Sequence, residues 1–130
     1  MKQRTMLWIL VSIIVVSCAN RAPGQIALSM VDFDFGTVPN TKAVSQTFEI
    51  RNVGRGTLEI TGVSTSCGCT TAKVTDSFVP PGENTELIVT YDPQAHGGAT
   101  GRFMRVVYIR SNDADTPEAQ LTIFVNVTEQ

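Results

Sequence analysis

The sequence predicts an all-β fold, an antiparallel β-sandwich of about seven strands. Three observations support this prediction. Apolar side chains recur at every second position after residue 25, turn-forming residues separate these runs, and no amphipathic helical pattern of useful length follows residue 18. The chain has 130 residues, which suits a single domain.

The strands are expected in the following order. The first contains Phe35, and Gly36 after it is expected to let the strand bend or change sheets. The run from Phe103 to Ile109 is apolar on both faces near its end, whereas the other runs alternate apolar and polar residues, as strands with one buried face do. The expected strands after the first are residues 44–51, 58–61, 86–91, 103–109 and 121–128.

Turn signals separate these runs. Glycine and asparagine at such places suit backbone conformations with positive φ or side-chain capping, so they are expected to be scaffold rather than site. The turn segments are Val38-Pro39-Asn40, Gly54-Arg55-Gly56, Pro80-Pro81-Gly82, Asp92-Pro93, Gly97-Gly98 and Ser111-Asn112-Asp113.

Residues 1–17 are expected to be an export signal. Lys2 and Arg4 precede an apolar run, Met6–Val16, which as a helix would cover about 16 Å of a hydrocarbon core ~30 Å thick. A cleavable signal therefore fits better than a spanning helix. The run ends Val-Val-Ser-Cys18, which resembles the bacterial lipobox, so we expect cleavage before Cys18 and lipid on that cysteine. The alternative is an ordinary signal that happens to contain a cysteine.

This prediction divides the chain into a signal peptide (residues 1–17), a lipidated cysteine with a tether (18–25) and the sandwich domain (26–130). The protein would be exported and anchored to the membrane through Cys18, most simply facing the periplasm of a Gram-negative bacterium. Ala19 stands where an aspartate often marks retention in the inner membrane, and the choice of membrane stays open.

Charge argues against two classes of partner. Without Lys2 and Arg4 the chain has eight basic and twelve acidic side chains, a net charge of −4. A mildly acidic domain with scattered charges lacks the basic patch of a nucleic-acid-binding protein. It also lacks a polybasic segment for anionic lipid.

Several motifs follow one another along the chain: Phe33-Asp-Phe-Gly-Thr-Val38, Phe48-Glu-Ile-Arg-Asn-Val-Gly54, Leu58-Glu-Ile60, Ser66-Cys-Gly-Cys-Thr70, Pro80-Pro-Gly-Glu83, residues 87–92 and Arg110-Ser-Asn112. Together they resemble one bacterial family, Domain of Unknown Function 1573. That family is Ig-like and related to the ASH (ASPM, SPD-2, Hydin) modules, so the resemblance implies an Ig-like antiparallel sandwich in the cell envelope, with biochemical activity unassigned. The sole tryptophan, Trp8, lies in the signal, so the Cys–Trp–Cys pattern of antibody domains is missing.

Cys67 and Cys69 are the residues of this sequence that could carry redox or metal chemistry. In an extended strand, residues i and i+2 lie about 6.6 Å apart, at the far limit for a disulfide. Gly68 between them would let the chain curl and close an easily reduced bond. The competing interpretation is that one or both cysteines are inert, buried small hydrophobes.

A metal site is the third interpretation of this pair. Tetrahedral zinc usually takes four ligands, and beyond these thiols the chain offers His96 and carboxylates. Copper(I) accepts two thiolates, to which Met30 or Met104 would add a thioether. No other cofactor is expected.

His96, the single histidine, lies in a flexible loop and is expected to be solvated, and no catalytic motif or paired carboxylate spacing is present. We therefore expect a non-enzymatic binding or structural module that contacts another envelope protein, with no nucleic-acid partner and no evident small-molecule substrate. The alternative is a small thiol redox or copper-binding protein that uses Cys67 and Cys69.

Overall fold

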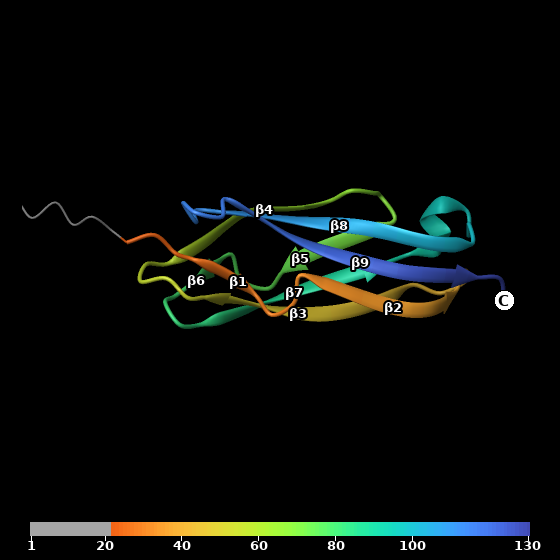
Figure 1. The fold of residues 1–130 in the computed structure, drawn as a ribbon, viewed down its shortest axis with the longest axis horizontal. Coiled ribbons are helices and arrows are strands. Elements are labelled where there is room, and N and C mark those ends of the chain that lie inside the picture. Colours follow the sequence, from red (N-terminus) through yellow and green to blue (C-terminus); the bar gives the residue numbers. More distant parts are fainter. Residues whose placement is uncertain (1–21) are drawn as a thin grey trace, which may run out of the picture.

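The computed structural model describes residues 22–130. The expected signal peptide and Cys18 lie outside this range. Residues 22–130 form two packed β-sheets (Figure 1), so the predicted all-β, Ig-like sandwich is confirmed. The elements are β1 (Ile26–Leu28), β2 (Asp32–Pro39), β3 (Val44–Asn52), β4 (Leu58–Thr65), β5 (Thr70–Val74), β6 (Phe78–Val79), β7 (Asn84–Tyr91), the 3₁₀ helix η1 (Pro93–His96), β8 (Gly101–Ser111) and β9 (Glu118–Thr128).

One sheet has the strand order β1-β3-β7-β5 and the other β2-β9-β8-β4-β6. Neighbouring strands are antiparallel except β2 and β9, which run parallel. The chain crosses from the second sheet to the first between β4 and β5. The short loop of this crossover contains Cys67 and Cys69.

The core forms where the inward faces of the two sheets meet. In β7, Leu87 and Val89 are fully buried while Glu86 is exposed, the period-two pattern that one buried face requires. In β9, Leu121 and Ile123 are likewise fully buried. Each such side chain contributes roughly 1.5–3 kcal/mol when removed from water, so apolar packing holds the two sheets together.

The expected bend at Gly36 is a β-bulge. Gly36 has φ 73°, and the register between β2 and β9 shifts between Asp34 and Thr37. Asp34 Oδ1 accepts a hydrogen bond of 2.8 Å from the Gly36 backbone N–H. The glycine thus bends the edge strand, as bulges do.

Asn52, at the end of β3, is a fully buried polar side chain with four hydrogen bonds. Its Nδ2 donates to the carbonyls of Gly56 (2.7 Å) and Val79 (2.8 Å). Its Oδ1 accepts from the N–H groups of Gln25 (3.1 Å) and Gly54 (2.9 Å). One side chain therefore ties together the segment before β1, the turn after β3, and β6.

Residues 22–25, part of the segment expected to be a tether, pack against the domain. Gly24 is buried, and Gln25 O accepts a hydrogen bond of 2.9 Å from Val53 N–H. This segment lies at one end of the sandwich, whereas η1 and the β4–β5 crossover lie at the opposite end (Figure 1). No helix within residues 22–130 is long and apolar enough to cross a membrane.

Candidate functional site

Cys67 and Cys69 are joined by a disulfide bond in the loop between β4 and β5. Their Cα atoms are 5.3 Å apart, within the usual range for a disulfide and shorter than an extended strand would allow. The reason is local: residues 66–69 form a turn rather than a strand. Gly68 does not need a positive φ there, and a Cβ at this position would meet nothing within 4 Å.

Hydrogen bonds to β4, to β8 and to the residue that follows β7 hold this loop. The Ser66 backbone N–H donates to the carbonyl of Val106 in β8 at 2.9 Å. The Val106 N–H in turn donates to the Ser66 hydroxyl, also at 2.9 Å. Cys69 O accepts from Asp92 N–H, just after β7, at 2.8 Å. The Thr65 hydroxyl lies 2.9 Å from Cys67 O and 2.8 Å from Thr70 O. The disulfide is therefore fixed in place relative to the sheets.

The two sulfurs differ in access to solvent. Cys69 is 2% exposed and packs into the core cluster, whereas Cys67 is half-buried at the surface. Cys67 Sγ also accepts a hydrogen bond of 3.0 Å from the backbone N–H of Cys69. An incoming molecule would reach Cys67 first.

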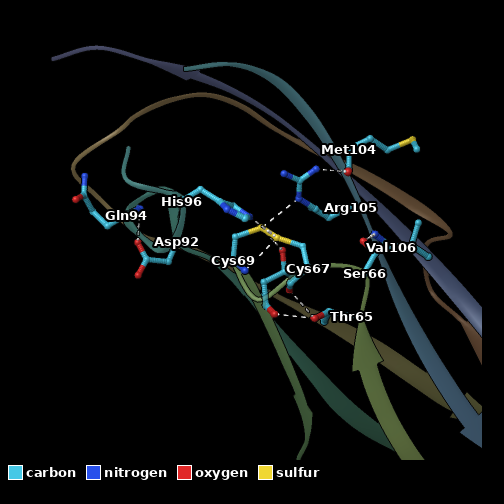
Figure 2. The surroundings of a disulfide bond; sticks show 11 residues. Thr65, Ser66, Cys67, Cys69, Asp92, Gln94, His96, Met104, Arg105 and Val106 are labelled. Atoms are coloured by element: carbon cyan, nitrogen blue, oxygen red, sulfur yellow. Dashed lines mark hydrogen bonds between the residues drawn. A yellow bond between two sulfur atoms is a disulfide. The ribbon is translucent and has the colours of Figure 1, made fainter. Parts of the chain in front are cut away.

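His96 is exposed, as expected, but its ring also lies beside Cys67, a contact that was not expected. Asp92 caps η1 by accepting from Gln94 N–H at 2.9 Å, and Gly97 ends the helix in the left-handed conformation. This short capped helix places His96 Nε2 2.9 Å from Cys67 Sγ (Figure 2). The residues flanking His96 in the sequence have the signature of a capped helix, but they carry no information about its contact with Cys67.

Arg105 of β8 lies beside the other sulfur. Its Nε donates a hydrogen bond of 3.1 Å to Cys69 Sγ, and its Nη1 donates one of 2.8 Å to Met104 O (Figure 2). The guanidinium carbon lies 5.1 Å from the Phe103 ring centroid, a cation–π distance. A fixed positive charge thus points at the buried sulfur. The sequence contained one clue to it, an arginine on a strand face otherwise made of Phe103, Val107 and Ile109.

A second titratable group near Arg105 is Tyr91. Burial raises the pKa of Tyr91 above its ordinary value, while the Arg105 charge lowers it and Asp92 raises it. Tyr91 therefore stays a neutral phenol at physiological pH. It does not compete with Cys69 as an anionic partner for Arg105.

Cys67, Cys69 and His96 also form a candidate metal-ligand group, with ligand atoms within 4.8 Å of one another. Copper(I) or zinc would need the cysteines as thiolates, which the disulfide does not provide. The Met104 side chain points away from the disulfide (Figure 2), and Met30 lies in the turn between β1 and β2. The group would serve a metal only after reduction.

A surface hollow within residues 22–130 lies elsewhere. It has a volume of about 810 Å³ and is lined by Ala22, Arg55, Phe78 and their neighbours, at the end of the sandwich opposite the disulfide. The one candidate metal-ligand group of the described residues does not line it. The chemistry of the described residues is therefore concentrated around the two cysteines.

These features define an Ig-like sandwich with a surface disulfide closed over a single glycine. The chain belongs to the family described as Protein of unknown function (DUF1573), whose model matches residues 26–127. The resemblance inferred from the sequence motifs is therefore confirmed.

Solved structures agree on the fold. A protein of unknown function from Porphyromonas gingivalis W83 is similar with a TM-score of 0.73 and 26% identity, over 80% of this chain and 47% of that one. The chain thus spans about half the length of that relative. The ASH/PapD-like domain 7 of human CEP192 has a TM-score of 0.65 at 9% identity, over 81% of this chain and 86% of that one.

More distant likeness extends to an enzyme and a chaperone. The VesB protease of Vibrio cholerae has a TM-score of 0.60 at 18% identity, over 79% of this chain and 31% of that one. The YadV chaperone has a TM-score of 0.56 at 11% identity, over 78% and 51%. At such identities the likeness is one of fold alone. Comparison with curated proteins finds no match.

Proposed function

We propose that this protein is an exported lipoprotein, anchored through Cys18, whose Ig-like domain is a binding module that contacts an envelope protein at a strand edge without catalytic groups. The observation that carries this proposal is the open edge of β5. This strand pairs with β7 on one side, and no strand of residues 22–130 pairs with its other side. An open edge accepts an extended segment of another chain as an added strand.

The register shows which backbone groups are free for a partner. Thr75 N–H donates to Glu86 O, and Asp92 N–H donates to Cys69 O. In an antiparallel ladder the bonded positions alternate, so the odd-numbered residues of β5 face β7. The N–H and C=O groups of Ala72 and Val74 therefore point outward, where a partner strand would bind them.

The side chains of β5 suit such an edge. Thr71 and Lys73 are exposed, whereas Ala72 and Val74 pack against the core cluster. Lys73 places a charge on the edge, which discourages pairing with a second copy of the same strand and favours a partner with acidic side chains. The edge begins directly after the disulfide loop, at the end of the domain away from residues 22–25 (Figure 1). A lipid on Cys18 would leave this end facing away from the membrane.

The test is a proline substitution that removes only an outward donor. Ala72→Pro deletes an N–H that does not bond to β7, so the domain should keep its fold. Ala72→Val, the matched control, keeps the donor. Full-length wild type and both variants, purified from membranes in detergent, would be used to capture proteins from envelope extract. A partner retained by wild type and Ala72→Val but lost with Ala72→Pro supports the proposal, and equal capture by all three refutes binding at this edge.

A further inference from the structure

We propose that Cys67-Gly68-Cys69 is a thiol–disulfide exchange site whose substrate is a protein dithiol, with Cys67 as the attacked sulfur. In this assignment Arg105 stabilises the departing Cys69 thiolate, and His96 forms a hydrogen bond with Cys67. The proposal is independent of strand addition at β5. It rests on the bond between the two cysteines and on the hydrogen-bond donors placed at both sulfurs.

The bond is poorly suited to be a structural staple. A disulfide stabilises a fold mainly by restricting the unfolded chain, and the effect grows with the length of the closed loop. Here one residue separates the two cysteines, so little chain entropy is removed. The two sheets are held together by the apolar core instead.

Accessibility decides which sulfur is attacked. Thiol–disulfide exchange needs a thiolate to approach one sulfur of the bond while the other leaves. Cys69 is 2% exposed, whereas Cys67 is half-buried at the surface. A substrate thiolate therefore attacks Cys67 Sγ, and Cys69 becomes the leaving group.

The surroundings of Cys69 favour its departure. Arg105 Nε already donates to Cys69 Sγ at 3.1 Å, and a hydrogen bond from a cation strengthens when the acceptor becomes a thiolate. Cys67 Sγ accepts a hydrogen bond of 3.0 Å from the backbone N–H of Cys69, and His96 Nε2, which donates in its Nε2–H tautomer, lies 2.9 Å away. Because these groups favour the two thiolates over the bonded sulfurs, the site is poised to oxidise a dithiol.

The exchange balances without a further reactant. The first substrate thiolate forms a bond to Cys67 Sγ and breaks the Cys67–Cys69 bond, which yields a mixed disulfide and the Cys69 thiolate. The second substrate thiolate then attacks the substrate sulfur of the mixed disulfide and releases Cys67. The substrate loses two electrons and two protons to become a disulfide, and the protein gains two electrons to become a dithiol, with the protons taken up by the thiolates or released to water.

The experiment uses the full-length lipoprotein in detergent and dithiothreitol as the dithiol probe. After acid quenching and alkylation, the tryptic peptide of residues 56–73 reports the state of both cysteines without interference from Cys18. Arg105→Gln should slow reduction of the bond about tenfold or more, since one charge-assisted hydrogen bond is lost. In glutathione buffers it should shift the equilibrium toward the disulfide by a similar factor, about 30 mV per tenfold.

Arg102→Gln on the same strand is the matched control, because Arg102 pairs with Asp34 rather than with a cysteine. It should react like wild type, and Arg105→Lys should recover part of the rate. Equal rates for Arg105→Gln and Arg102→Gln would overturn the role of Arg105. A bond that dithiothreitol reduces only after the domain unfolds would overturn the exchange site itself.

Single-cysteine variants test which sulfur is attacked. Cys69→Ser, which keeps Cys67, should form a mixed disulfide with oxidised glutathione at least about tenfold faster than Cys67→Ser, because a thiol must be accessible to exchange. Adding His96→Ala to Cys69→Ser should slow this step, with thermal unfolding unchanged. Equal trapping at both cysteines would refute the assignment. Isolation of the protein with free thiols and bound copper would identify a metal site instead.

Discussion

His96 Nε2 lies 2.9 Å from Cys67 Sγ although 29 positions separate the two residues in the chain. The contact arises because β5 and β7 are antiparallel neighbours in one sheet. The loop before β5 and the helix after β7 therefore lie at the same end of the sandwich. The site is therefore a product of the strand order rather than of local sequence. Substitutions within the loop should accordingly leave its surroundings in place.

Gly68→Ala should be neutral. Gly68 has no positive φ, and a Cβ there would meet nothing within 4 Å, so we expect a change in the free energy of unfolding within about 0.5 kcal/mol. Gly82→Ala is the contrast, because Gly82 has φ 78° and an L residue there costs roughly 1–2 kcal/mol. Chemical denaturation measures both. Loss of the disulfide in Gly68→Ala would show that the loop depends on the glycine after all.

Asn52→Asp should destabilise the domain strongly. The substitution replaces the Nδ2 donor with an oxygen that faces the carbonyls of Gly56 and Val79, at a fully buried position. We expect the free energy of unfolding to fall by about 3 kcal/mol or more. Asn112→Asp is the matched control, because Asn112 also bridges backbone groups but is exposed, and its effect should be smaller. An equal decrease in the free energy of unfolding for both variants would mean that the burial of Asn52 does not determine the destabilisation.

The period-two pattern predicted the long strands because their buried faces alternate over eight or more residues. β1, β5 and β6 were not predicted, since segments of two to five residues show little alternation. The parallel pairing of β2 with β9 also has no local signature, because it joins an early and a late segment of the sequence. Pattern therefore identifies strands better than it identifies their neighbours.

The same limit applies to the site. The motif Ser66-Cys-Gly-Cys-Thr70 marked the cysteines directly, but their partners come from elsewhere: His96 from η1 and Arg105 from β8, 36 positions beyond Cys69. Arg105 stood out only as a charged residue on a mostly apolar strand face. A local motif can identify reactive atoms, whereas the charges that tune them depend on tertiary contacts.

Lipidation of Cys18 stays a prediction, because this residue lies outside the described range. We expect the mature protein to begin at Cys18 with a mass increase of two or three acyl chains on the N-terminal peptide. Cys18→Ala should abolish the modification and release the domain from the membrane fraction, since a lipid on this residue would be the anchor. Mass spectrometry and membrane fractionation measure both effects. An unmodified N-terminus beginning elsewhere would contradict the anchor and leave the fold unaffected.

Asp113 should make the domain sensitive to acid. Its side chain is 4% exposed, and burial alone raises the pKa of its carboxyl group. The backbone N–H groups of Ile26 (2.9 Å), Thr116 (3.1 Å) and Asp115 (2.9 Å) donate to it and more than offset burial, so its pKa lies below the ordinary value of 3.8. Because the folded-state pKa is depressed, this stabilisation is present above pH 3.8 and is lost as the pH falls through the folded-state value.

Asp113→Asn tests this directly. The amide keeps one acceptor oxygen but presents an NH₂ group where a second acceptor is needed, so the variant should lose about 1–3 kcal/mol at neutral pH. The difference from wild type should shrink as the pH falls below 3.8, because the wild-type carboxylate is then protonated. Asp34→Asn is the control: its pKa is also lowered, chiefly by the Gly36 N–H, but Asp34 is far more exposed. Unfolding curves from pH 2 to 7 measure the effect, and a difference between wild type and Asp113→Asn that does not vary with pH would show that the charge on Asp113 contributes nothing.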